Sequence, residues 1–270
     1  MLSQLLIGLL LAAAASLAAR LARALSWSGA AAATVLGTVV FGLGGWQWAV
    51  LLLAFFILSS ALTRAFRRLK RGAEEKYAKG GERDAMQVVS NGGLAGIFVL
   101  LHAAFPGAAW PWIGYAGALA AVNADTWATE LGVLDPGEPR LISSLRRRVE
   151  KGTSGGVSVV GTLASLAGAA IIGGLAAWFL GRDQASVTAI VALAGLVGSL
   201  VDSLLGATLQ AIYYCPTDHK ETEKHPLHTC GTKTIHLRGW KWLNNDWVNI
   251  ACSVAGALAA LGGAVLIGLR

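Results

Sequence analysis

Residues 157–181 read VSVVGTLASLAGAAIIGGLAAWFLG and contain no Asp, Glu, Lys or Arg. A helix of about 20 residues, at 1.5 Å per residue, crosses the roughly 30 Å hydrocarbon core of a bilayer. A stretch of this length and composition therefore predicts a membrane-spanning helix. Together with the other apolar stretches it predicts about eight spans, at about 2–23, 28–45, 47–63, 86–106, 110–133, 157–181, 185–213 and 246–269.

The composition of the whole chain agrees with a protein embedded in lipid. Its 270 residues are 55% hydrophobic and 14% charged, whereas soluble domains carry about 25% charged residues. The mean hydropathy is +0.58. We expect an all-α fold, a polytopic transmembrane helix bundle that forms a single integral membrane domain over residues 1–270. The chain contains 34 glycines, and small residues within spans let transmembrane helices pack closely.

The distribution of basic residues predicts the orientation of the bundle. Of 22 Lys and Arg residues, 20 follow the first span or lie in loops at about 64–85, 134–156 and 214–245. Because cytoplasmic loops are enriched in Lys and Arg, we expect these loops in the cytoplasm and both termini outside. Only Arg182 and Arg270 are expected on the outer side. The prediction is a multi-pass protein of the cytoplasmic (plasma) membrane.

The formal net charge of +7 raises the question of a nucleic-acid partner. Membrane orientation already accounts for the basic residues. The run from Arg64 to Arg71 suits contact with anionic membrane lipids, or it could gather an anionic substrate. No segment outside the expected spans is large enough to form a nucleic-acid-binding groove, so we expect no nucleic-acid partner.

Acidic side chains inside the expected spans are the strongest functional signal. Charged groups at membrane depth cost free energy, so those present are candidates for a functional site. Asp125 and Glu130, Asp202, and Asp246 lie on three spans, all toward the cytoplasmic ends. Carboxylate, amide and hydroxyl oxygens are hard ligands that suit Mg²⁺ and a nucleotide phosphate. The accompanying polar residues are Asn91, Asn123, Thr126, Ser203, Gln210, Asn245 and Asn249.

Hydrogen bonding between helices is the alternative explanation for these polar residues, and it suffices for a single Asn or Thr. Helical spacing places Asn123, Thr126 and Glu130 on one face of their span. Three acids at one depth favour a functional site over simple helix packing.

A glycine-rich segment precedes the sixth expected span. Residues 151–158 read KGTSGGVS and run directly into that span. Glycines let a backbone approach a ligand, and a helix N-terminus attracts anions, so this segment could cradle phosphate. It is not a P-loop, because the order G-x-x-x-x-G-K-[ST] is absent. A flexible turn before a helix is the alternative. The residues concerned are Lys151, Gly152, Thr153, Ser154, Gly155 and Gly156.

The last cytoplasmic loop concentrates metal-ligating side chains. Four of the five histidines and two of the three cysteines lie between residues 215 and 236. Cys215, His219, His228 and Cys230 could supply four ligands for a structural zinc ion. A solvated polar loop with reduced cysteines is the alternative.

Taken together, these motifs resemble the domain-of-unknown-function ninety-two family, also called the transmembrane protein nineteen family. The resemblance covers nearly the whole chain in order. Members of that family often have a second Cys at the position of Asp218. The motifs that carry the resemblance are SNGG (90–93), NADTWATELG (123–132), KGTSGGVSVVGT (151–162), GSLVDSLLGATLQ (198–210), HTCG (228–231) and NNDWVN (244–249).

The resemblance implies a kinase. Plant members include phytyl-phosphate kinase, which converts an isoprenyl monophosphate into a diphosphate with a nucleoside triphosphate, CTP being favoured. The family is also distantly similar to CTP-dependent polyprenol kinases, whose Asp-Thr-x-Ala element matches Asp125 to Ala128. Their Lys-x-x-Glu-Gly element matches Lys151 to Gly155, except that Ser154 stands where they have Glu.

We therefore expect an integral membrane isoprenyl-phosphate kinase whose active site faces the cytoplasm. Asp125, Asp202 and Asp246 would hold Mg²⁺ at the donor phosphates, and Lys151 with the glycine-rich segment would hold the donor chain. Glu130 would be a ligand or would orient one. A transporter or scramblase that uses the buried acids as ion sites is the alternative, and a non-catalytic membrane scaffold is a third.

Overall fold

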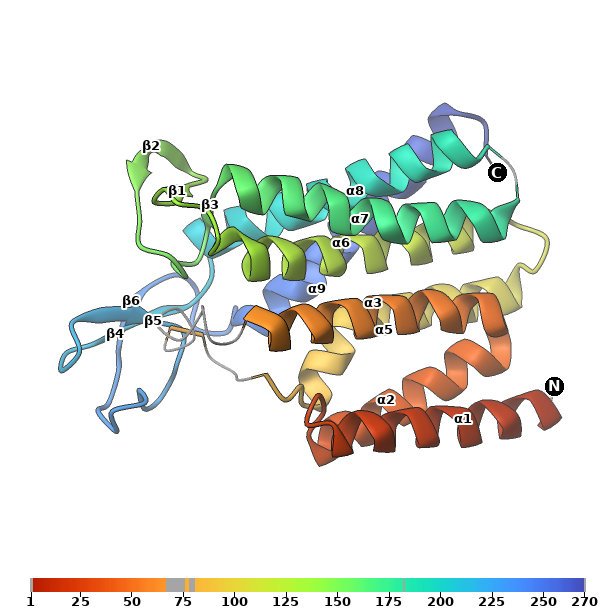
Figure 1. The fold of residues 1–270 in the computed structure, drawn as a ribbon, viewed down its shortest axis with the longest axis horizontal. Coiled ribbons are helices and arrows are strands. Elements are labelled where there is room, and N and C mark those ends of the chain that lie inside the picture. Colours follow the sequence, from red (N-terminus) through yellow and green to blue (C-terminus); the bar gives the residue numbers. More distant parts are fainter. Residues whose placement is uncertain (1, 67–75, 78–80, 182, 270) are drawn as a thin grey trace.

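The computed structural model describes residues 2–66, 76–77, 81–181 and 183–269. In these residues eight long helices form one bundle (Figure 1), so the all-α polytopic prediction is confirmed. The helices are α1 (Leu2–Leu21), α2 (Trp27–Val39), α3 (Trp46–Phe66), α5 (Ala85–Ala104), α6 (Trp110–Gly132), α7 (Val159–Leu180), α8 (Gln184–Thr208) and α9 (Asn245–Leu266), and a π-helical turn η1 (Val40–Gly44) continues α2.

Within the described residues, seven of these helices are long and apolar enough to cross a membrane, and α6 is not among them. The position of α6 explains its lower hydropathy. It packs against α3, α5, α7, α8 and α9, and every residue from Pro111 to Ala124 is buried. Protein rather than lipid surrounds α6, so this helix can carry polar residues through the centre of the bundle.

Small residues let the central helices approach one another closely. A Cβ atom added at Gly256 of α9 would lie 2.5 Å from Ala121 Cβ and 2.6 Å from the Gly117 carbonyl oxygen of α6. One at Gly198 of α8 would lie 2.4 Å from the same Ala121 Cβ. These distances are shorter than any van der Waals contact, so α6, α8 and α9 touch through their backbones.

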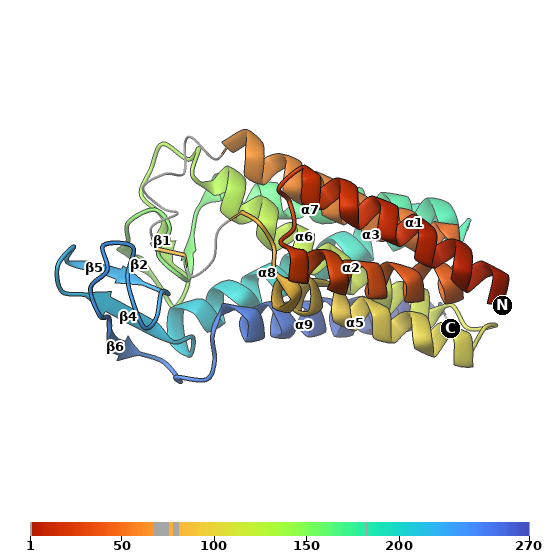
Figure 2. The same ribbon diagram turned by 90° about the horizontal axis from the view of Figure 1, so that it is seen from below.

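The connections at one end of the bundle contain two small antiparallel sheets, which the sequence did not predict (Figure 2). The expected span 185–213 is corrected here: α8 ends at Thr208, because the chain then turns into a strand. In the order β2-β1-β3, the first sheet holds β1 (Arg140–Leu141), β2 (Ser144–Arg148) and β3 (Gly156–Val157); in the order β5-β4-β6, the second holds β4 (Ile212–Cys215), β5 (Lys220–Thr222) and β6 (Ile235–Arg238).

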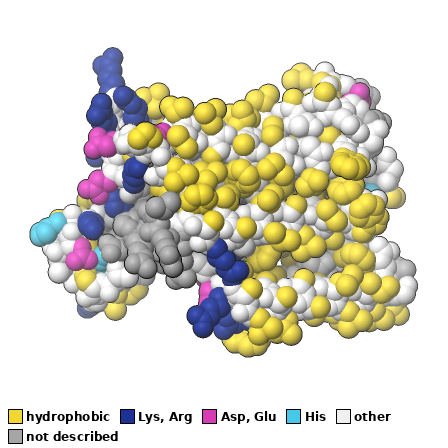
Figure 3. Space-filling model, viewed as in Figure 1, with side chains coloured by type: hydrophobic (Ala, Val, Ile, Leu, Met, Phe, Trp, Pro, Cys, Tyr) yellow, Lys and Arg dark blue, Asp and Glu magenta, His cyan; other side chains and the backbone are white. Residues whose placement is uncertain are grey.

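Charge separates along the molecule. Figure 3 shows most Lys, Arg, Asp and Glu side chains toward the end of the molecule that carries the sheets, while hydrophobic side chains cover the body of the bundle. Both termini lie at the opposite end (Figure 1). The basic sheet end is the one that we predict to face the cytoplasm. Of the basic residues used for that prediction, Lys79, Arg182, Arg270 and those at 67–71 lie outside the described residues.

Aromatic side chains fill the end of the bundle where the termini lie. The rings of Trp48 and Trp112 meet edge to face at 4.9 Å, and Tyr115 stacks on Trp112 at 5.8 Å. The Tyr115 hydroxyl donates to the Trp48 carbonyl, and Trp112 Nε1 donates to the Ala176 carbonyl at 3.0 Å. Packed, hydrogen-bonded rings therefore close this end of the bundle.

The backbone contact between α6 and α9 can be tested with two glycines of α9. Gly256→Ala should lower the stability of the protein by about 1–3 kcal/mol, because the new methyl group overfills a packed core. Gly262→Ala is the matched control, because nothing lies within 4 Å of its added Cβ. It should leave stability unchanged or raise it by up to about 1 kcal/mol. Thermal unfolding in detergent measures both variants; equal midpoints would contradict the packing.

Candidate active site

A cavity of about 590 Å³ opens at the sheet end of the bundle, between the ends of the helices and the two loops that carry the sheets. Most of the residues that the sequence suggested line this single space, although they come from distant parts of the chain. They are Asn91, Asp125, Thr126, Glu130, Lys151, residues 152–156, Asp202, Ser203, Gln210, Asn245, Asp246 and Asn249.

Three aspartates on three helices share the cavity: Asp125 on α6, Asp202 on α8 and Asp246 on α9. Asp202 interacts electrostatically with Asp125 and with Glu223. Among the described residues, no donor lies within hydrogen-bonding distance of the buried Asp202 Oδ2. Carboxylates held together in a low dielectric repel one another, so this arrangement attracts a cation.

Glu130 lies at the cavity wall and joins three elements. It is 4% exposed, and its Oε1 accepts a hydrogen bond of 2.8 Å from Thr63 Oγ1 of α3. Its negative charge also acts on Arg83, just before α5. This geometry suits a residue that orients the site.

Arg83 is a cavity residue that the sequence motifs did not identify. Its Nη2 donates to Ser59 Oγ at 2.9 Å, and its guanidinium lies over the Phe55 and Phe56 rings. Burial lowers the pKa of Arg83 to about 10, and Glu130 opposes that shift. The side chain therefore remains a cation at neutral pH. A usable signal was present in the sequence, since the capping box of Asp84 and Gln87 places Arg83 directly before a helix.

The glycine-rich segment lies against α8. Gly152 and Gly155 have φ angles of +81° and +83°, which favour glycine. A Cβ atom at Gly155 would lie 2.5 Å from the backbone nitrogen of Ala207. The N–H groups of Thr153 and Gly156 donate within local turns, so these two do not point toward a ligand. The segment thus forms a close-fitting wall of the cavity.

Lys151 both lines the cavity and stabilises the end of α6. Its Nζ donates to the carbonyl oxygens of Val133 at 2.8 Å and Asp135 at 2.6 Å. A cation at a helix C-terminus is favourable because of the helix dipole. Two of its three N–H donors are occupied in this way.

Glu223 is a second cavity residue that the sequence did not single out. Its Oε1 accepts hydrogen bonds from Ser154 Oγ at 2.6 Å and from Gln210 Nε2 at 2.8 Å. It thereby connects the glycine-rich segment, the end of α8 and the second sheet. No local motif marks it, because its partners are 69 and 13 residues away in the chain.

Two predicted site residues lie elsewhere. Asn123 is fully buried one turn deeper than Thr126, and its Nδ2 donates to the Gly168 carbonyl of α7 at 2.8 Å. It therefore joins two helices and does not line the cavity. His219 has a left-handed φ of +52° in the turn between β4 and β5. Its ring turns back to the Tyr214 hydroxyl, 3.0 Å away, instead of joining the other predicted metal ligands.

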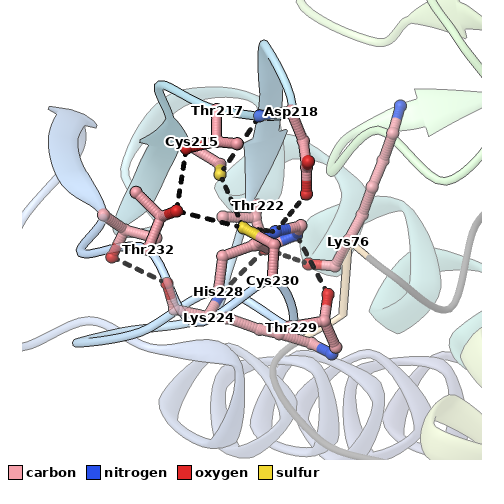
Figure 4. Close-up of polar contacts among 11 residues, drawn as sticks. Lys76, Cys215, Thr217, Asp218, Thr222, Lys224, His228, Thr229, Cys230 and Thr232 are labelled. Carbon is pink, nitrogen blue, oxygen red and sulfur yellow. Dashed lines mark hydrogen bonds and ion pairs between the residues drawn. The ribbon is translucent and has the colours of Figure 1, made fainter.

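The place expected for His219 is taken by Asp218. Figure 4 shows the side chains of Asp218, Cys215, His228 and Cys230 converging at the side of the second sheet. Their ligand atoms all lie within 4.8 Å of one another.

The connection between α3 and α5 contacts both loops that carry the sheets. Lys76 Nζ lies 2.7 Å from Glu150 Oε2 and lowers the pKa of that carboxyl. The Lys76 carbonyl accepts from the backbone N–H of Glu223 at 2.8 Å. Residues of three connections thus hold one another over the open end of the bundle.

Comparison with known proteins places this architecture among integral membrane proteins. The profile of a family described as "Integral membrane protein DUF92" matches residues 10–257. Protein PGR of Arabidopsis thaliana is 34% identical over 250 residues, which are 84% of this chain and 84% of that protein.

Two further relatives extend the comparison. An uncharacterized membrane protein of Methanocaldococcus jannaschii is 34% identical over 210 residues, covering 77% of this chain and 84% of that protein. Protein VTE6, chloroplastic, of Arabidopsis thaliana is 27% identical over 243 residues, covering 88% of this chain and 64% of that protein. No solved structure matches the chain.

The bridging role of Glu223 can be tested by hydrogen exchange. Glu223→Ala should speed amide exchange over residues 152–156, because Ser154 loses the acceptor that ties this segment to the sheet. Glu221→Ala is the matched control. Glu221 is half-exposed and lies 3.8 Å from Arg238, so its removal should leave that exchange unchanged. Equal exchange in both variants and the wild type would contradict the bridge.

Proposed function

The chain belongs to the DUF92 family of integral membrane proteins, and we propose that it is a membrane-bound kinase. In this proposal it transfers a phosphoryl group from a nucleoside triphosphate, with CTP as the preferred donor, to an isoprenoid lipid monophosphate, giving the diphosphate. The active site is the cavity at the sheet end, facing the cytoplasm.

The observation that carries the proposal is a cavity lined by acidic, basic, amide and hydroxyl side chains at the end of an apolar bundle. Asp125, Asp202 and Asp246 all line it, at the boundary between the apolar surface of the helices and the charged loops. A lipid phosphate has the same division, since its hydrocarbon tail belongs in the bilayer and its head group at the interface. A water-soluble nucleotide can reach the cavity from the loop side.

The donor set fits Mg²⁺. Three carboxylates lie beside amide and hydroxyl groups, and Asp202 Oδ2 has no donor among the described residues. Asp125, Asp202 and Asp246 would hold the ion, since hard oxygen ligands suit it. When bound, Mg²⁺ would neutralise charge on the phosphates of the donor.

The cationic residues of the cavity suit the acceptor and the donor chain. Arg83, Lys151 and Lys224 line the space and would offset the charge of the phosphates. A phosphate monoester is already ionised at neutral pH, so its oxygen can attack without a strong general base. The aspartates are therefore assigned to metal binding, and Glu130 to holding Arg83 and Thr63 in place.

The resemblance to a family with a plant phytyl-phosphate kinase supports the choice of an isoprenoid phosphate, and the similarity to CTP-dependent polyprenol kinases supports CTP. The aromatic packing at the opposite end of the bundle favours an enzyme over a transporter. Trp48, Trp112 and Tyr115 close that end, whereas transport requires access from both sides.

Replacing the proposed metal ligands should abolish transfer. Asp125→Asn and Asp202→Asn keep the side-chain shape and remove a charge. Each should lower activity by more than the roughly 10–100-fold typical for loss of an outer-shell partner. Asp183→Asn is the control: Asp183 has a left-handed φ of +47° in the turn before α8, a conformation that Asn also accepts. Full activity in both site variants would contradict the assignment.

The substrates are tested by mass analysis of reaction products. Purified protein in detergent, with Mg²⁺, is given prenols or prenyl monophosphates together with CTP, ATP, GTP or UTP. We expect prenyl diphosphate, formed fastest with CTP. The kinase proposal would be contradicted if no combination of acceptor and nucleotide gave a phosphorylated product. If the protein also dissipated a substrate gradient in proteoliposomes without nucleotide, the transporter alternative would be supported.

A further inference from the structure

We propose that Cys215, Asp218, His228 and Cys230 bind one structural Zn²⁺ ion that holds the second sheet over the cavity. This site is separate from the three aspartates, and it does not depend on the proposed kinase activity. The end of β4 supplies Cys215, the turn that follows it supplies Asp218, and the tight turn at residues 228–231 supplies His228 and Cys230.

The distances between ligand atoms fit a tetrahedral zinc site. Two sulfurs that are each 2.3 Å from zinc at a tetrahedral angle lie about 3.8 Å apart. Here Cys215 Sγ and Cys230 Sγ are 3.5 Å apart. His228 Nδ1 lies 3.5 Å from Cys230 Sγ and 2.8 Å from Asp218 Oδ2. All four ligand atoms therefore surround a single point (Figure 4).

The ligand types select zinc over the harder ions. Two thiolates and an imidazole prefer zinc, whereas Mg²⁺ and Ca²⁺ prefer oxygen ligands. Asp218 supplies the single oxygen ligand of the set, and carboxylate oxygen is an ordinary zinc ligand. With a neutral histidine, the four ligands carry three negative charges, which Zn²⁺ reduces to one. The cysteines lie on the predicted cytoplasmic side, where thiols stay reduced.

The surroundings of the sulfurs support metal binding. The backbone N–H of Asp218 donates to Cys215 Sγ at 3.5 Å. Hydrogen bonds of this kind stabilise thiolate ligands. Cys215 is fully buried and His228 is 5% exposed, so the site is shielded on its inner side.

The position of the site explains what the ion would do. The segment between its two pairs of ligands carries Glu223, which bonds to Ser154 and Gln210 in the cavity wall. The same segment accommodates the Lys76 carbonyl, which accepts from Thr222 Oγ1 at 3.2 Å. Joining the two ends of this segment through zinc restricts it and holds Glu223 in place.

The test measures zinc in the full-length protein purified in detergent without chelator. We expect about one zinc per chain by elemental analysis, as for other closed four-ligand sites. Asp218→Ala and Cys215→Ser should lose that zinc. Asp218→Cys should retain it and release it to EDTA more slowly than the wild type, because a thiolate is a softer ligand.

His219→Ala is the matched control, because His219 is adjacent in sequence and its ring points to Tyr214. This variant should keep its zinc. Cobalt substitution checks that the ligands are assembled in the folded protein. Wild type and Asp218→Cys, each loaded with Co²⁺, should both show the charge-transfer absorption of cobalt thiolates.

Three results would overturn the proposal. The first is wild-type protein without zinc that also takes up none from a zinc-containing buffer. The second is loss of zinc from His219→Ala equal to that from Asp218→Ala. The third is a disulfide between Cys215 and Cys230 in the protein as purified, found by counting free thiols after denaturation.

Discussion

The contact between the backbones of α6 and α9 is so close that a Cβ atom at Gly256 would lie 2.5 Å from Ala121 Cβ. Lipid tails are as apolar as the helix surfaces, so helices in a membrane associate through such packing and not through the hydrophobic effect. Here the packing buries α6 from Pro111 to Ala124. A helix surrounded by protein can carry Asp125 and Glu130, which would be costly if they faced lipid.

The packing of the bundle also determines at which end polar groups are accessible to water. The end with the termini is filled by Trp48, Trp112 and Tyr115, whereas the other end carries the sheets and the charged side chains. Water and charged ligands therefore approach from the sheet end. Specific contacts hold the loops there, including the ion pair of Lys76 with Glu150 and the hydrogen bond of Ser154 to Glu223. The loops therefore form an ordered wall of the cavity.

Much of the candidate site was predictable because the residues concerned are unusual for their surroundings. Asp125, Asp202 and Asp246 stand out in apolar spans, and all three line one cavity. Glu223 did not stand out, because an acidic residue in a charged loop is ordinary. Helical spacing predicts Asn123 in the site because it gives the face of a helix on which a residue lies but not its depth. One turn further into the bundle that face contacts α7, and Asn123 bonds to α7 instead of lining the cavity.

The sequence alone determined the number and approximate bounds of the long helices, and its loop charges predict the orientation. Both follow from local rules of length, hydropathy and charge, which need no knowledge of neighbouring helices. The tertiary structure alone decided that α8 ends at Thr208, that the loops fold into sheets, and that Asp218 and not His219 joins the cysteines. These outcomes depend on backbone conformation and on contacts between residues far apart in the chain, such as the 67 residues that separate Thr63 from Glu130.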